Sequence, residues 1–181
     1  IWATTNKPTP VNFTTHHYFN LHNASGTIHD HQLQIQASHI LEQDKELVVT
    51  GKYIDVEGGT HDLRKGIELA EGLKLVPEYD QSFVLDKGIS PSPVRSASLS
   101  AHGSPWKLEV WTTEPVCHFY TGKWIPQVAG KNNQSYGAFS GLCLETQIHP
   151  NAVNIPSFPN TILRPGETYR QHTIYKALPE K

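Results

Sequence analysis

The chain has 181 residues, of which 37% are hydrophobic and 18% are charged. This is the composition of a globular protein, and the length is sufficient for one sizeable domain with its own core. The 15 Lys and Arg residues against 17 Asp and Glu residues give a net charge of -2, which argues against a nucleic-acid or anionic-membrane partner, and no apolar run approaches the roughly 20 residues of a membrane span.

Predicted strands dominate the chain. Alternating apolar and polar residues predict strands at 33–37, 46–50, 82–85, 97–100, 108–112 and 168–175. Helical periodicity is scarce, and the best candidate, residues 63–73, is weakened by Gly66 and Gly72. Short strands between frequent Gly and Pro turns indicate an all-β sandwich or barrel, and without an internal repeat or linker we expect one domain.

Cysteine, methionine and sequon content bear on the origin of the chain. Two cysteines, Cys117 and Cys143, are too few for a disulfide framework, and we expect small buried thiols rather than a bridge between them. The chain lacks methionine and begins with Ile1, so we expect a processed or proteolysed product. Three Asn-x-Ser/Thr sequons favour a secreted origin slightly over a cytoplasmic one; their asparagines are Asn12, Asn23 and Asn133.

The first candidate site lies in residues 14–21, where His16 and His17 precede an aromatic pair. Neighbouring side chains on an extended strand face opposite sides, so one imidazole can point into a cleft while the other points away. The alternative is a strand with two half-exposed histidines and no chemistry.

The second candidate is His29-Asp30-His31. Imidazoles at positions i and i+2 lie on one face of a strand, which is compatible with a metal site. Because no further ligand set is evident, we favour a turn that enters the predicted strand near Leu33.

Two carboxylates complete the candidates. Asp80 stands just before an apolar strand, where it caps a turn or holds the hydroxyl groups of a ligand. Glu145 follows the apolar run from Leu142 to Leu144. If Glu145 is buried, desolvation raises its pKa and suits it to act as a base near neutral pH. The alternative is a carboxylate that faces solvent or pairs with an arginine.

Together these segments resemble the aldose 1-epimerase (galactose mutarotase) family, in family order and over essentially the whole chain. Residues 15–21 (THHYFNL) resemble the family signature NHSYFNL, and residues 79–85 (YDQSFVL) resemble YDHxFVL. Residues 145–154 (ETQIHPNAVN) resemble ETQxxPDAVN. Further resembling blocks are residues 28–35, 59–64, 112–122 and 162–169.

The resemblance implies both a fold and an activity. The implied fold is a large antiparallel β-sandwich, the galactose-mutarotase-like supersandwich, of which residues 1–181 form the C-terminal half. The implied reaction interconverts the α and β anomers of free hexoses such as glucose and galactose by acid/base-catalysed ring opening, without a metal or organic cofactor. His16 matches the catalytic acid and Glu145 the catalytic base, while Asp80 and Glu114 match positions that bind the monosaccharide.

A family domain is nearly twice as long as this chain. The resemblance therefore implies a partner, such as a second chain that carries the N-terminal half, because this half alone would expose strand edges and an apolar face. The sequence also departs from the family pattern near the expected site, at Thr15, His17, Gln81, Val116 and His118.

These departures leave two other functions open. One is a non-catalytic, secreted carbohydrate-binding or structural module on the same fold. The other is a hexose-phosphate mutarotase, which needs cationic groups for the phosphate; the candidates are Arg64, Arg95, Arg164 and Arg170.

Overall fold

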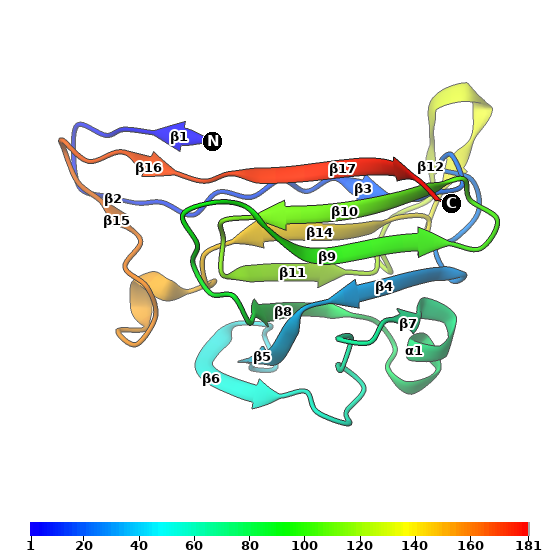
Figure 1. Ribbon diagram of the computed structural model, residues 1–181, viewed down its shortest axis with the longest axis horizontal. Coiled ribbons are helices and arrows are strands. Elements are labelled where there is room, and N and C mark those ends of the chain that lie inside the picture. The colour runs from blue at the N-terminus through cyan, green and yellow to red at the C-terminus, as the bar shows by residue number, and fades with distance from the viewer. Residues whose placement is uncertain (181) are drawn as a thin grey trace.

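The computed structural model describes residues 1–180, except for the side chain at position 132. Two antiparallel sheets lie one over the other (Figure 1). The five-stranded sheet has the order β17 (Thr173–Pro179), β10 (Trp106–Thr112), β9 (Val94–Ala101), β4 (His31–Ile35) and β7 (Ile67–Glu68). The six-stranded sheet has the order β3 (Tyr18–Phe19), β14 (Leu142–Gln147), β11 (Val116–Tyr120), β8 (Asp80–Leu85), β5 (Ala37–Gln43) and β6 (Val49–Asp55).

The remaining elements are short. Three two-stranded ribbons join β1 (Trp2–Ala3) to β16 (Tyr169–Arg170), β2 (Thr9–Pro10) to β15 (Ile162–Leu163), and β12 (Val128–Ala129) to β13 (Ser135–Tyr136). The helices are α1 (Leu69–Leu75) and the 3₁₀ turns η1 (Lys131–Asn133) and η2 (Ala152–Asn154). Among residues 1–180, none of the helices has the length and apolar character needed to cross a bilayer.

The core lies between the two sheets. Strand alternation turns the apolar residues of each sheet inward, and both sheets contribute side chains that are almost completely buried; examples are Leu33, Ile35, Leu99 and Val110 from one sheet and Phe83, Phe119, Leu142 and Leu144 from the other. Each such side chain contributes about 1.5–3 kcal/mol through removal from water. This arrangement confirms the predicted antiparallel β-sandwich.

The predicted strands differ from the observed ones where side chains favour a turn. The prediction of a strand at 46–50 was partly wrong, because β6 begins only at Val49. The carboxylate of Asp44 accepts the backbone N–H groups of Glu46 and Val48, and Leu47 adopts a φ of 63°. These bonds close a tight turn before the strand can start.

The predicted helix is displaced along the chain. It was expected at 63–73, but α1 spans Leu69–Leu75. Gly66 takes a φ of 83°, which ends the preceding turn in a conformation that a helix does not allow. Gly72 lies inside α1, where an added Cβ would come within 2.5 Å of the Tyr79 hydroxyl, so close packing explains this glycine.

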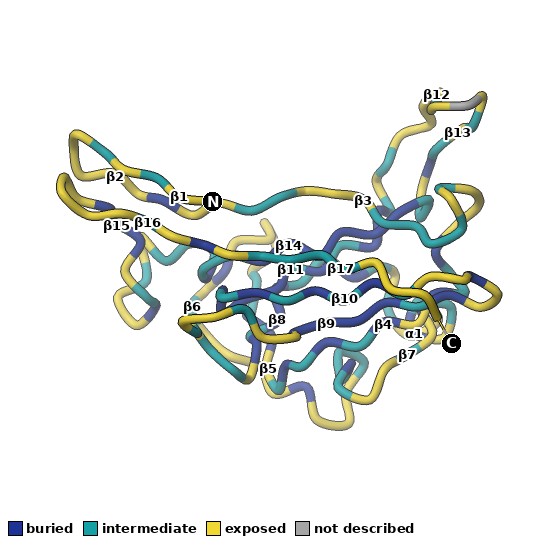
Figure 2. The backbone as a smooth tube through the Cα atoms, turned by 45° about the horizontal axis from the view of Figure 1, so that its top comes forward, coloured by how far each residue is buried: buried dark blue, intermediate teal, exposed yellow. Residues whose placement is uncertain are grey.

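One side of the sandwich presents the open edges of both sheets. β17 is the outer strand of one sheet and β3 the outer strand of the other, and residues along both are only partly buried (Figure 2). Between the two edges the rings of Phe19 and Tyr175 are 5.1 Å apart. The β1–β16 ribbon and the β12–β13 ribbon project at opposite ends of this side (Figure 1).

Candidate active site

The candidate site lies on the face of the six-stranded sheet that is turned away from the core. Leu142 and Leu144 of β14 point into the core, so the alternation of the strand turns Cys143 and Glu145 to the other face. On the neighbouring strand β11, His118 stands directly opposite Glu145. Glu145 is nonetheless only 7% exposed, because adjacent side chains cover it.

His16 reaches this face from the segment just before β3. Its Nε2 lies 3.7 Å from Oε1 of Glu145, and its side chain is 53% exposed. The two residues line one hollow of about 540 Å³, to which Ser82 and His118 also contribute. The structure therefore brings together two residues that are far apart in the sequence and that the family resemblance marked as acid and base.

The electrostatics around Glu145 favour a basic carboxylate. Burial raises the pKa of Glu145, and the nearby Asp80 raises it further, while His118 and His16 partly oppose that rise. A carboxylate with a raised pKa binds a proton more readily, which is the property required of a general base. Of the two alternatives that the sequence left open for Glu145, the structure thus agrees with the buried one.

Asp80 lies on β8, next to the hollow. It does not itself belong to the hollow's lining, but its Oδ1 is 2.8 Å from Nε2 of His118, which does. Nδ1 of His118 is in turn 3.0 Å from the hydroxyl of Ser82. His118 thus connects Asp80 to the face that carries Glu145.

Sequence reasoning did not assign a role to His118, which it noted only as a departure from the family pattern. The signal that would have found it is the register of β11 between its neighbours. Ser82 of β8 and Glu145 of β14 both stand opposite His118. Such a register depends on long-range pairing and cannot be read from one strand alone.

The structure does not bring Glu114 into this hollow. Glu114 lies in the turn between β10 and β11, is 5% exposed and accepts a hydrogen bond of 3.3 Å from Thr113. It lines a separate hollow together with Ile1 and Arg170. Lys87 donates to the Glu114 carbonyl at 2.7 Å, and burial lowers the pKa of this lysine to about 8.

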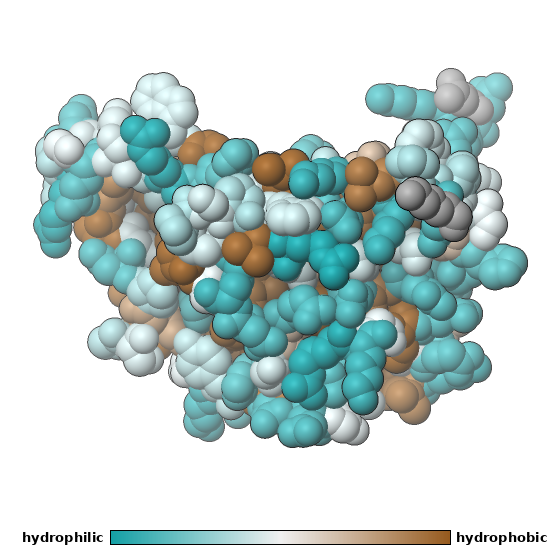
Figure 3. Space-filling view, viewed as in Figure 1, coloured by the Kyte–Doolittle hydropathy of each residue, from teal (hydrophilic) through white to brown (hydrophobic). Residues whose placement is uncertain are grey.

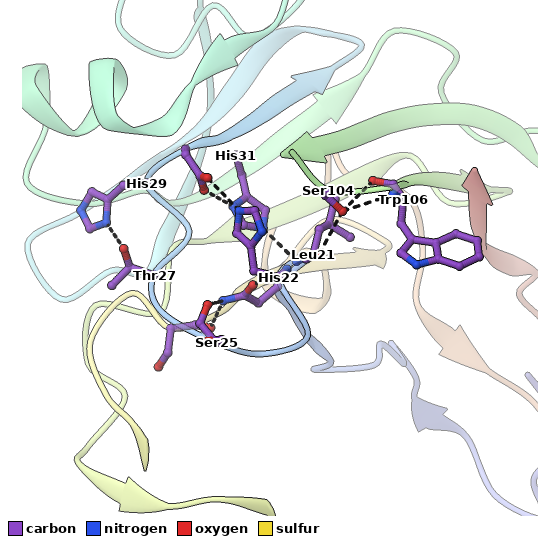
Figure 4. A network of polar contacts seen from close by, with 11 residues as sticks. Leu21, His22, Ser25, Thr27, His29, His31, Ser104 and Trp106 are labelled. Carbon is purple, nitrogen blue, oxygen red and sulfur yellow. Dashed lines mark hydrogen bonds and ion pairs between the residues drawn. The ribbon is translucent and has the colours of Figure 1, made fainter. Parts of the chain in front are cut away.

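The His29-Asp30-His31 segment forms a turn into β4, as favoured from the sequence. His29 contacts the hydroxyl of Thr27 at 2.7 Å, away from His31 (Figure 4). It is His22, and not His29, that joins Asp30 and His31. Nε2 of His22 lies 2.7 Å from Oδ2 of Asp30, and Oδ1 of Asp30 lies 3.1 Å from Nδ1 of His31.

A metal at this cluster conflicts with the protonation of His31. Nε2 of this fully buried imidazole accepts the backbone N–H of Leu21 at 2.9 Å (Figure 4). Nδ1 of the neutral ring must then carry the proton that it donates to Asp30, so it offers no lone pair to a metal. Burial also lowers the pKa of His31, which keeps the ring neutral.

Two sets of three side chains within the described residues have potential ligand atoms within 4.8 Å of one another. These sets are His22, Asp30 and His31, and His16, Cys143 and Glu145. In the second set the two nitrogens of His16 already face a thiol and a carboxylate of β14. Hydrogen bonds account for the first set, and in the second set one hydrogen bond and one looser ion pair involve both nitrogens of His16, so we assign a metal to neither.

The two cysteines are buried free thiols, and the three sequon asparagines are exposed. Cys117 and Cys143 are free and buried, which confirms the prediction of two thiols. Asn23 and Asn133 are exposed and have positive φ angles, as in turns. Asn12 is exposed too, but its side-chain amide donates to the carbonyl of Ile148 at 2.9 Å.

Comparison with known proteins places the chain in a family. The sequence model of the aldose 1-epimerase family matches residues 2–176. The chain is 43% identical to human galactose mutarotase, over 96% of this chain and 52% of that protein. It is 32% identical to aldose 1-epimerase of Escherichia coli K12, over 98% of this chain and 54% of that protein.

Solved structures show the same fold. The GalM/aldose epimerase homologue from C. elegans superposes with a TM-score of 0.89 at 31% identity, over 99% of this chain and 55% of that one. Galactose 1-epimerase from Lactobacillus acidophilus superposes with a TM-score of 0.80 at 24% identity, over 99% of this chain and 52% of that one. The chain spans about half the length of the relatives it matches. It belongs to the aldose 1-epimerase family.

Proposed function

We propose that this chain supplies the acid and base of an aldose 1-epimerase that interconverts the α and β anomers of free hexoses such as glucose and galactose. The observation that carries the proposal is the approach of His16 and Glu145, with Nε2 and Oε1 3.7 Å apart at the side of one hollow. The names of the relatives point the same way, because they include galactose mutarotase and aldose 1-epimerase.

In the proposed reaction, Glu145 removes the proton of the anomeric hydroxyl while His16 donates a proton to the ring oxygen. The bond between the anomeric carbon and the ring oxygen breaks, and an open-chain aldehyde forms. Rotation about the neighbouring C–C bond presents the other face of the aldehyde, and the reverse proton transfers close the ring. Acid and base act together, so neither a bare alkoxide nor a bare oxocarbenium ion builds up; each such group contributes about 10²–10⁴-fold in rate.

The raised pKa of Glu145 matches this role. Burial makes its carboxylate a stronger base than a solvated glutamate, and an imidazole N–H can act as the acid opposite it. These two groups account for both proton transfers, so the proposal uses no metal and no organic cofactor.

Asp80 is the proposed sugar-binding carboxylate. His118 engages its Oδ1 at 2.8 Å, which fixes the carboxylate and leaves Oδ2 to accept a hydroxyl group of the sugar. Glu114 was expected in the same role from the resemblance, but its place in a separate hollow removes it from the proposed site.

The remainder of the family domain is the proposed partner. Residues 1–181 would form the C-terminal part of one sandwich, and the open edges of β17 and β3 offer unpaired backbone to further strands. Apolar residues are visible along this edge between the two projecting ribbons (Figure 3). A second chain, or further residues of the same protein, would cover them.

The sequons at Asn23 and Asn133 are proposed glycosylation sites. Both asparagines are exposed in turns, whereas the side-chain amide of Asn12 is already held by a hydrogen bond to the carbonyl of Ile148. Intact mass before and after glycosidase treatment of secreted material tests this, and unchanged mass would refute it.

Polarimetry on freshly dissolved α-galactose tests the activity. We expect the optical rotation to reach equilibrium faster with the protein than without it. His16→Ala should lower the protein-dependent rate about 10²–10⁴-fold. His17→Ala is the matched control, because the neighbouring ring is exposed and packs beside Phe19 and Tyr175 instead. Sugar binding without any faster exchange would instead indicate a non-catalytic carbohydrate-binding module.

A further inference from the structure

The thiol of Cys143 lies against the imidazole of His16. Its Sγ is 3.2 Å from Nδ1, while Nε2 of the same ring faces Glu145 at 3.7 Å. Cys143 and Glu145 are two positions apart on β14 and share a face, so a single strand presents one group to each ring nitrogen.

The thiol is the donor in this contact. Burial, and then the charge of Glu145, raises the pKa of the Cys143 thiol well above its usual range, so the S–H proton is retained. The hydrogen bond therefore runs from the thiol of Cys143 to Nδ1 of His16.

The opposite arrangement is unfavourable. If Nδ1 of the neutral ring carried the proton and donated to sulfur, the bare lone pair of Nε2 would face the Glu145 carboxylate. A lone pair directed at a negative charge repels it, whereas an N–H directed there is attracted.

We infer that Cys143 is a positioning residue of the proposed acid/base pair: its thiol donates to Nδ1 of His16 and holds the neutral imidazole in the tautomer that carries its proton on Nε2, on the side of Glu145. The inference rests on the proposed function for its catalytic meaning. In a neutral histidine, the hydrogen bond made by one ring nitrogen decides where the proton of the other resides.

The other groups around His16 do not replace the thiol. The rings of Tyr18 and Tyr120 approach it at centroid distances of 5.0 and 6.3 Å, and His118 lines the same hollow. Among residues 1–180, it is Cys143 that forms the hydrogen bond to Nδ1. Because the ring is about half exposed, water would take this place if the thiol were removed.

Cys117 offers a matched control on the neighbouring strand. Like Cys143 it is completely buried and free. It belongs to the core between the sheets, on the opposite face of the six-stranded sheet from His118. Replacing either cysteine removes a buried sulfur, but only the change at Cys143 removes a donor to His16.

The test is ¹⁵N NMR of the imidazole nitrogens in ¹⁵N-histidine-labelled protein, at a pH where His16 is neutral. The His16→Ala variant identifies the signals of His16. We expect widely separated resonances for a bare Nδ1 and a protonated Nε2. In Cys143→Ala they should move towards each other as both tautomers become populated, while Cys143→Ser, which keeps a donor, should preserve the separation. Cys117→Ala should leave the signals unchanged.

Activity supplies the second readout. Cys143→Ala should lower kcat about 10-fold and change KM less than about twofold, with Cys143→Ser recovering most of the loss. Unmoved His16 signals in Cys143→Ala, or the same movement in Cys117→Ala, would overturn the inference. If the signals respond as expected but the unmodified protein does not exchange anomers, the positioning role stands and the proposed function fails.

Discussion

Two histidine–carboxylate clusters of this protein use similar residues for different ends. At the start of β4, His31 is fully buried and its contacts are short, 3.1 Å to Asp30 and 2.9 Å from the Leu21 N–H. On the outer face of the six-stranded sheet, His16 is half exposed and its distance to Glu145 is 3.7 Å.

The difference lies in what remains free to react. Each ring nitrogen of His31 is used inside the protein, so this cluster can only stabilise the fold. His16 and Glu145 approach each other at the side of a hollow of about 540 Å³ without closing into a short hydrogen bond, and a ligand in the hollow can contact both. A loose ionisable pair beside a cavity indicates chemistry, and a saturated pair indicates structure.

Substitution of Glu145 should give the largest effect. Glu145→Gln keeps the side-chain volume but removes the base, so we expect the rate of anomer exchange to fall about 10²–10⁴-fold. The free energy of unfolding should stay within about 1 kcal/mol of the original value or rise, since a buried charge is removed. Polarimetry and urea denaturation on the same preparation check both parts. A strong loss of stability with little loss of rate would show that Glu145 stabilises the fold and does not act in the reaction.

His31→Ala should show the opposite pattern. The change leaves the Leu21 N–H and Asp30 without their partner and opens a cavity, so we expect a loss of about 2–4 kcal/mol in the free energy of unfolding. The rate per folded molecule should remain within about threefold, because His31 is not part of the hollow's lining. Urea denaturation followed by tryptophan fluorescence measures the loss, and an unchanged midpoint would contradict the structural role.

The contributions of His31 and Glu145 to the free energy of unfolding should change in opposite directions as the pH falls. Burial lowers the pKa of His31 below its usual 6.5, so the unfolded chain protonates first and the His31 contribution to stability is lost as the pH falls below about 6.5. Burial raises the pKa of Glu145, so the folded protein protonates first and this residue adds stability as the pH falls through its raised pKa towards about 4.5.

The contribution of each residue to the free energy of unfolding is the difference between the unmodified protein and a variant that lacks that residue. Between pH 7 and about 5, the free energy of unfolding of the unmodified protein should rise relative to that of Glu145→Gln. Over the same range, the loss of stability caused by His31→Ala should become smaller. The reason is that the unmodified protein itself loses the contribution of His31 to the free energy of unfolding. Urea titrations at several pH values provide the data, and parallel curves for a variant and the unmodified protein would rule out the corresponding pKa shift.

His29→Ala should have the smallest effect. His29 lies two residues before His31, but its ring is hydrogen-bonded to the exposed Thr27 hydroxyl and packs beside Phe139, outside the buried cluster. We expect a change of less than about 0.5 kcal/mol in the free energy of unfolding and no change in rate. A loss comparable to that of His31→Ala would place His29 in the cluster that the structure assigns to His22, Asp30 and His31.

The sequence predicted the sandwich because the alternation of strand residues is local, whereas the expected site residues came from the family resemblance. Leu142 and Leu144 precede Glu145 on one strand. Their burial in the core follows from the two-residue period of strand side chains, which turns Glu145 to the other face. The pairing of His16 with Glu145 came from the family resemblance, since nothing local to either segment indicates that they meet.

The rest depends on contacts between distant segments. His118 faces Glu145 only through the register of β11 against β14, and His22 reaches Asp30 only because the chain turns back before β4. Glu114 was expected at the sugar site, but it lies in the turn that joins β10 to β11, where it lines a different hollow. Strand register and turn position are set by the whole fold and not by a single segment.

A crystal structure of the protein with bound galactose tests the central claim most directly. We predict a pyranose in the hollow, with its anomeric oxygen within hydrogen-bonding distance of Glu145, its ring oxygen within reach of Nε2 of His16, and a hydroxyl group on Asp80. Galactose bound at a different face of the protein, or an empty hollow at saturating galactose, would contradict the account.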